Sequence, residues 1–146
     1  MNKIYEVHSP AETRALAAEM GRKASAGEIV CLNGDLGTGK TVFAKGFAEG
    51  LGIEEAIVSP TFTILREYKS GRLPLYHFDV YRIEDADEMH ELGYEEYFYG
   101  DGVTLIEWAG LIAELLPSSA VRVLIEKDES AGDDFRRITI RTRDEE

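Results

Sequence analysis

Cysteine, long apolar segments and basic residues are all scarce in this 146-residue sequence. The only cysteine is Cys31, so no internal disulfide can form, as is typical of a reducing compartment. No apolar run approaches the roughly 20 residues that a membrane-spanning helix needs. The segment from Met1 to Glu6 has no apolar core of the kind that a secretion signal carries. We therefore expect a cytoplasmic protein that does not associate with membranes.

The charge balance limits the partners that the chain can bind. Sixteen Lys and Arg stand against 28 Asp and Glu, which gives a formal net charge of −12. A field of this sign repels a phosphate backbone, so we expect no direct nucleic-acid binding by the chain alone. The acidic runs at 84–88, 95–96 and 144–146 are interpreted either as solvated surface or as a docking face for a basic partner.

The hydrophobic patterns predict a single α/β domain over residues 1–146. Ser9 and Glu12 form a predicted capping box at the start of the first helix, which runs from Pro10 towards Gly27. Further helices are expected at 40–51, at 85–92 and up to residue 117. Strands are expected at 3–8, 28–33, 62–68, 73–81, 103–106, 121–126 and 135–141. Turns at 69–72 and 128–134 predict two hairpins, so the central sheet should be mixed, with helices on its flanks.

One motif identifies the expected chemistry. Residues 34–41, Gly-Asp-Leu-Gly-Thr-Gly-Lys-Thr, match the phosphate-loop pattern G-x-x-x-x-G-K-[ST] between an apolar strand and an amphipathic helix. Glycines let backbone N–H groups face phosphate oxygens, and the helix adds the positive end of its dipole. Lys40 would reach the β- and γ-phosphates, and the Thr41 hydroxyl would bind Mg²⁺. We therefore predict a P-loop NTPase-like domain that binds Mg-ATP through Gly34, Asp35, Leu36, Gly37, Thr38, Gly39, Lys40, Thr41 and Val42.

Such a loop also needs an acidic residue at the end of an apolar strand, which holds Mg²⁺ through water. Both Glu107 and Asp79 end apolar runs, and either could instead be an ordinary strand-end carboxylate. We assign the metal to Glu107, because its strand is the more continuously apolar and hence the more central. His77 shares a strand face with Asp79, but no Cys or H-x₃-H pattern supports a transition-metal site. The polar segment 59–63 either reaches the γ-phosphate or is a turn that enters a strand.

Taken in order, five motifs make the sequence similar to the TsaE family, formerly called YjeE. They are the loop 34–41, Ser59-Pro60-Thr61-Phe62-Thr63, His77-Phe78-Asp79-x-Tyr81-Arg82, Glu88-x₃-Leu92-Gly93-x₃-Tyr97-Phe98 and Glu107-Trp108. The resemblance implies the ATPase component of bacterial threonylcarbamoyladenosine synthesis, a tRNA modification carried out with TsaB and TsaD. It implies further that ATP hydrolysis resets the TsaB–TsaD complex and that the chain does not itself transfer the threonylcarbamoyl group. The tRNA would be reached only through these partners.

The same resemblance implies roles for individual residues. Lys40 would hold phosphate, while Thr41 and Glu107 would bind the metal. Asp79 and Thr61 would lie near the γ-phosphate, with Asp79 orienting the attacking water. A contact with the base is assigned to Thr13, and Arg136 or Arg137 is a further candidate for such a contact.

Two other functions stay open on sequence grounds. A small-molecule kinase shares the loop and the metal but usually adds an acceptor pocket and an arginine-bearing lid. A nucleotide-gated binding module differs from an ATPase only in its rate of hydrolysis. Because no general base or arginine finger stands out, we expect slow hydrolysis by the isolated chain and activation by its partners.

Overall fold

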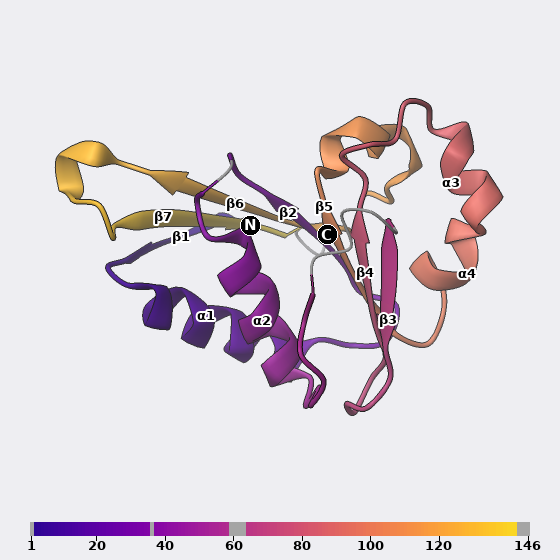
Figure 1. The fold of residues 1–146 in the computed structure, drawn as a ribbon, viewed down its shortest axis with the longest axis horizontal. Coiled ribbons are helices and arrows are strands. Elements are labelled where there is room, and N and C mark those ends of the chain that lie inside the picture. The colour runs from indigo at the N-terminus through magenta and orange to yellow at the C-terminus, as the bar shows by residue number, and fades with distance from the viewer. Residues whose placement is uncertain (1, 36, 59–63, 143–146) are drawn as a thin grey trace.

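The computed structural model describes residues 2–35, 37–58 and 64–142, which build a seven-stranded sheet with helices on both faces (Figure 1). The strands are β1 (Asn2–Val7), β2 (Ile29–Asn33), β3 (Leu65–Tyr68), β4 (Leu75–Asp79), β5 (Val103–Glu107), β6 (Val121–Lys127) and β7 (Arg136–Arg141). The α-helices are α1 (Pro10–Lys23), α2 (Lys40–Gly50), α3 (Asp87–Leu92) and α4 (Tyr94–Phe98). Two 3₁₀ segments are η1 (Ala109–Leu115) and η2 (Glu129–Ala131).

The strand order is β1-β7-β6-β2-β5-β4-β3. Strand β2 pairs in parallel with β5 on one side and β6 on the other, and β4 pairs in parallel with β5. Both predicted hairpins are present, because β3 is antiparallel to β4 and β7 is antiparallel to β6. Strand β1 also pairs with β7 in the antiparallel sense. The predicted α/β class with a mixed central sheet flanked by helices is confirmed.

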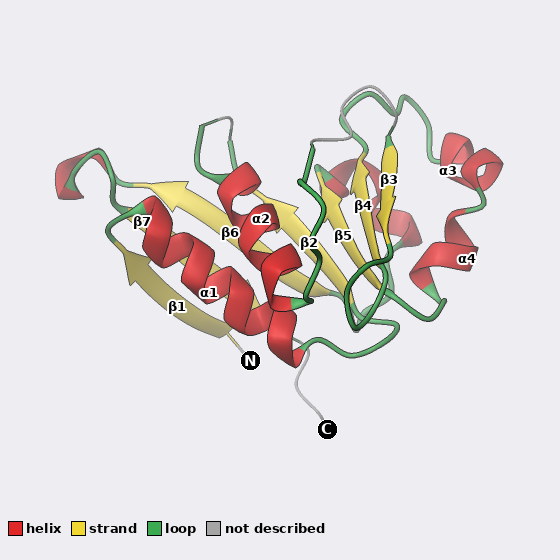
Figure 2. Cartoon of the chain, turned by 60° about the horizontal axis from the view of Figure 1, so that its bottom comes forward, coloured by secondary structure: helices red, strands yellow, loops and turns green. Residues whose placement is uncertain are grey.

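Alternate residues of the central strands enter two separate cores. In β2, Val30 and Leu32 pack on the side of α1 and α2, whereas Ile29 and Cys31 belong to the core on the opposite face. Figure 2 shows α1 and α2 lying together across one face of the sheet. The Cys31 side chain is fully buried, and this burial raises the pKa of its thiol to about 11. Such a thiol contributes apolar packing and is a poor nucleophile.

Helices α1 and α2 approach each other at backbone distance. A Cβ atom added to Gly46 or Gly50 would collide with a carbonyl oxygen of α1. The end of α1 is held by Arg72, whose guanidinium donates to the carbonyl oxygens of Gly21, Arg22 and Ala24 at 2.7, 2.7 and 2.8 Å. The helix that carries the loop is therefore braced by α1, and α1 is braced by the β3–β4 hairpin.

Local details differ from the sequence prediction. Ser9 caps α1 as expected, but the Glu12 carboxylate accepts from the N–H of His8 at 2.6 Å, so the capping interaction is displaced by one residue. The segment after β5 is 3₁₀ in place of the expected α-helix, because Trp108 (φ 64°) precedes it and Ile112 has non-helical backbone angles. The unassigned segment Tyr94–Phe98 forms α4, whose two end residues are buried. No helix among the described residues is long and apolar enough to cross a membrane.

Candidate functional site

The glycine-rich loop, residues 34–41, leads from β2 into α2. Gly37 and Gly39 have φ values of 81° and 109°, a region that favours glycine. A Cβ atom on Gly34 would lie 2.7 Å from Thr38 Oγ1 and 2.8 Å from a carbonyl oxygen of β6. The shape of this loop therefore depends on Gly34, Gly37 and Gly39, of which Gly34 and Gly39 are the two glycines of the motif. Leu36, a predicted nucleotide contact, lies outside the described residues.

Within the loop, Thr38 folds back on Asp35. The backbone N–H and the hydroxyl of Thr38 both donate to the carbonyl oxygen of Asp35, at 3.3 and 2.8 Å. Helix α2 then begins at Lys40 with no acidic residue in its first turn and no side-chain cap among the described residues. Its first N–H groups and the positive end of the helix dipole are thus available to an anion.

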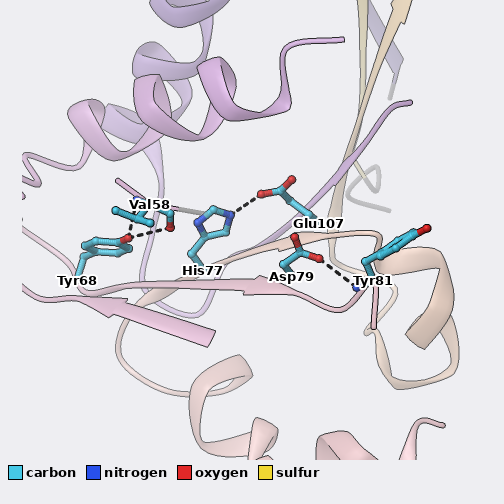
Figure 3. A network of polar contacts seen from close by, with 6 residues as sticks. All are labelled: Val58, Tyr68, His77, Asp79, Tyr81 and Glu107. Carbon is cyan, nitrogen blue, oxygen red and sulfur yellow. Dashed lines mark hydrogen bonds and ion pairs between the residues drawn. The ribbon is translucent and has the colours of Figure 1, made fainter. Parts of the chain in front are cut away.

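Two carboxylates lie at the carboxyl ends of adjacent parallel strands. Asp79 of β4 stands opposite Glu107 of β5 in the register, and both side chains are buried. The N–H of Tyr81 donates to Asp79 Oδ1 at 3.0 Å, which fixes the orientation of that carboxylate (Figure 3). The N–H of Val80 donates to the carbonyl oxygen of Glu107 at 3.2 Å, so the two strand ends are joined beyond the regular ladder.

A buried histidine completes this cluster. His77 Nε2 lies 2.7 Å from Glu107 Oε2, and the His77 side chain points toward Glu107 from β4 (Figure 3). His77 is 1% exposed, and its Nδ1 atom has no hydrogen-bond partner in the described part of the chain. The local sequence pattern around His77 does not predict this contact with Glu107. The available signal was that His77 and Asp79 share a strand face beside another strand ending in Glu107.

Lys40 is drawn toward the same cluster. Its ammonium nitrogen lies 3.8 Å from the centroid of the Trp108 ring. The Trp108 ring also packs against that of Tyr81, with 4.8 Å between the ring centroids. Burial lowers the pKa of Lys40, while the negative charges of Glu107, Asp79 and Asp35 oppose that shift. Trp108 has a left-handed backbone, uncommon for a residue with a side chain, directly after Glu107.

The segment 59–63, which includes Thr61, lies outside the described residues, but its described neighbours are anchored near β4. The Tyr68 hydroxyl accepts from the N–H of Val58 at 3.0 Å and donates to the Val58 carbonyl oxygen at 3.2 Å (Figure 3). On the other side, the carbonyl oxygen of Ile64 accepts from the N–H of Asp79 at 2.8 Å. Ile64 also has a positive φ of 68°.

Thr13 and Arg136 lie beside Thr38 of the loop, around one cavity. With Pro10, Thr38 and Asp134 they line a small cavity of about 40 Å³ between α1, the loop and the β6–β7 hairpin. The guanidinium of Arg136 is bonded to backbone carbonyl oxygens, whereas Arg137 lies near Asp128 and Glu6, at 3.5 and 4.0 Å. A larger cavity of about 530 Å³ opens beside the loop, between Trp108 and the end of β6.

The structure thus brings Lys40, Asp79 and Glu107 together at one sheet edge. Thr41 and Val42 occupy the next positions of the first turn of α2. Thr13 is placed next to Thr38, on the outer side of the loop. In open α/β sheets this edge, at the carboxyl ends of the parallel strands, is where ligands bind.

Comparison with known proteins shows the family of this chain. Residues 7–138 match the family model described as "Threonylcarbamoyl adenosine biosynthesis protein TsaE". The tRNA threonylcarbamoyladenosine biosynthesis protein TsaE of Bacillus subtilis is 54% identical over 131 residues, 90% of this chain and 80% of that protein. Its Treponema pallidum counterpart is 42% identical over 132 residues, 90% of this chain and 95% of that protein.

Among solved structures, the crystal structure of Bacillus subtilis YdiB superposes with a TM-score of 0.84 at 45% sequence identity. The match covers 97% of this chain and 86% of that one. Sequence and structure agree over nearly the whole described chain, and the protein belongs to the TsaE family of tRNA threonylcarbamoyladenosine biosynthesis proteins.

Proposed function

We propose that this chain is a Mg²⁺-dependent ATPase that works with TsaB and TsaD in the threonylcarbamoylation of tRNA. One observation carries the proposal. Lys40, at the uncapped start of α2, lies near the buried carboxylates of Asp79 and Glu107. A cation and two carboxylates at the carboxyl ends of parallel strands suit a nucleotide phosphate with its metal ion. The tRNA itself would be engaged through the partners.

The donor set fits a nucleotide. The N–H groups of the loop and of the first turn of α2 would hold phosphate oxygens, and Lys40 would leave the Trp108 ring to join them. Thr41 and Glu107 would hold Mg²⁺, which neutralises phosphate charge when bound. The described residues include no group of three or more His, Cys, Asp or Glu that could hold a metal. Phosphate oxygens and water molecules would therefore supply the remaining ligands.

Asp79 is the group best placed to orient an attacking water. Its carboxylate is held by the N–H of Tyr81, so it needs no rearrangement to act as a fixed acceptor. Glu107 is instead held by His77, which suits a residue that must keep one orientation toward a metal. These two environments support the division of roles between the carboxylates.

Charge stabilisation by arginine is assigned to the partners. Arg72 is bonded to three carbonyl oxygens at the end of α1, and Arg136 is bonded to carbonyl oxygens of the loop and of the β6–β7 connection. Neither guanidinium is therefore free to act as an arginine finger. A trans-acting group would complete the site, and hydrolysis would reset the TsaB–TsaD complex.

The test is ATP hydrolysis by the purified chain, alone and with TsaB and TsaD, with and without Mg²⁺. We expect slow hydrolysis alone and strong stimulation by both partners, lost in Asp79→Asn and in Glu107→Gln. Glu91→Gln, an exposed carboxylate on α3, is the matched control and should behave as wild type. Tight nucleotide binding without stimulated hydrolysis would contradict the ATPase and favour a nucleotide-gated binding module.

A further inference from the structure

One side chain far from the glycine-rich loop in sequence is bonded to its outer face. Arg136, the first residue of β7, donates from Nε to the carbonyl oxygen of Thr38 at 2.8 Å and from Nη2 to that of Gly37 at 3.4 Å. Its Nη1 donates to the carbonyl oxygens of Asp133 and Phe135, at 2.7 and 2.6 Å. A single guanidinium therefore ties the connection before β7 to the loop.

The same hairpin reaches the loop a second time. Lys127, the last residue of β6, is the cross-strand partner of Arg136. Its ammonium nitrogen lies 3.3 Å from the position that a Cβ atom on Gly37 would occupy. Two cations of the β6–β7 hairpin thus lie against the outer face of the loop, in a chain whose net charge is −12.

The contact with Thr38 matters because a peptide group is planar. The carbonyl of Thr38 and the N–H of Gly39 belong to one peptide unit and point in opposite directions. Holding the carbonyl outward, against Arg136, therefore holds the Gly39 N–H inward. Gly39 has a φ of 109°, and a glycine next to this peptide leaves its rotation weakly restrained by local sterics.

We propose that Arg136 is a positioning residue for phosphate binding, which orients the peptide between Thr38 and Gly39 so that the Gly39 N–H faces the phosphate. The proposal rests on the proposed function, because it needs a nucleotide in the loop. It also reassigns Arg136, whose guanidinium serves the loop and not the base. Lysine could not replace it fully, since one ammonium cannot match the forked donors that reach Thr38, Asp133 and Phe135 together.

The test compares Arg136→Gln and Arg136→Lys with Arg141→Gln. Arg141 is the last residue of β7, at the opposite end of the strand from Arg136, and its guanidinium donates to Oδ1 of Asn2 at 3.3 Å. Two quantities are measured: the protection of the Gly39 amide against hydrogen exchange at saturating ADP, and the Kd for ADP by calorimetry. Melting temperatures are recorded for every variant, so that loss of global stability is seen separately.

We expect Arg136→Gln to lower the protection of Gly39 at saturating ADP and to weaken ADP binding about tenfold, the loss of roughly one charge-assisted hydrogen bond. Arg136→Lys should recover part of both effects, and Arg141→Gln should match wild type. Wild-type exchange and affinity in Arg136→Gln would overturn this role alone, as would a weakened affinity that merely follows a lower melting temperature. Failure of the wild-type chain to bind ADP would overturn the proposed function and this role with it.

Discussion

His77 Nε2 and Glu107 Oε2 lie 2.7 Å apart, joining two adjacent parallel strands through a contact that is buried on both sides. The histidine thereby fixes the direction in which the Glu107 carboxylate points. Hydrogen-bonded partners of metal-binding carboxylates commonly change metal affinity when they are removed. This relationship leads to the first prediction.

Replacing His77 should weaken the binding of Mg²⁺ more than the binding of nucleotide. In His77→Ala we expect the Mg²⁺ concentration for half-maximal, partner-stimulated hydrolysis to rise about tenfold, because Glu107 loses its orienting partner. ADP affinity measured without Mg²⁺ should change little. His77→Gln keeps a hydrogen-bond donor, so its half-maximal Mg²⁺ concentration should lie between those of wild type and His77→Ala. His90→Ala, at an exposed position of α3, is the control. Equal losses of ADP affinity with and without Mg²⁺ in His77→Ala would contradict this prediction.

Trp108 should report nucleotide binding directly. The chain has one tryptophan, and the Lys40 ammonium lies over its ring. Because phosphate would draw Lys40 away, titration with ADP should change the tryptophan emission in a saturable way. Adenosine, which has no phosphate, should leave the emission unchanged, and Lys40→Met should abolish the response to ADP. An identical response to adenosine would show that the ring senses the base and not the lysine.

Arg72 should contribute to stability and not to catalysis. Arg72→Met removes three hydrogen bonds to the carbonyl oxygens at the end of α1, so we expect the free energy of unfolding to fall by about 2 kcal/mol. Hydrolysis by the folded variant should be unchanged at a temperature well below its melting point. Arg66→Met, an exposed position on β3, is the matched control. A selective loss of hydrolysis with wild-type stability would instead indicate a catalytic arginine.

Tyr76 should make the protein sensitive to alkaline pH. Burial, together with the hydrogen bond to Asp101, raises the pKa of the Tyr76 phenol to about 12. The folded state therefore keeps this proton longer than the unfolded state, whose tyrosine pKa is about 10. The resulting stabilisation is complete below pH ~10 and is lost as pH rises towards ~12.

The measurement is chemical unfolding between pH 8 and 12. Over this range the free energy of unfolding of wild type should fall by up to about 2 kcal/mol more than that of Tyr76→Phe, since the variant has no phenol at this position to titrate. Tyr5→Phe, a position that packs against the core on the α1–α2 side of the sheet, away from Tyr76, serves as the control for alkaline effects shared by the whole chain. Parallel pH profiles for wild type and Tyr76→Phe would contradict this explanation.

The glycine-rich loop was predictable because its requirements are local. Gly37 and Gly39 adopt backbone angles that favour glycine, and the N-terminus of α2 follows directly from the residues around Lys40. The central strands were predictable for a similar reason, since continuous apolar runs such as β2 and β5 are buried on both faces of the sheet. These features depend on neighbours in the chain, so the sequence by itself determined them.

Contacts between distant segments depended on the tertiary structure. The strand order places Asp79 opposite Glu107 and brings His77 to the same carboxylate, although no local pattern determines which strands pair. Arg136 meets Thr38, 98 positions earlier in the chain, only because β7 returns beside β6. The sequence determined which residues are candidates for the site, because backbone angles and burial patterns are local. The tertiary structure decided which of those residues orient one another, because strand order and hairpin packing are set by the whole chain.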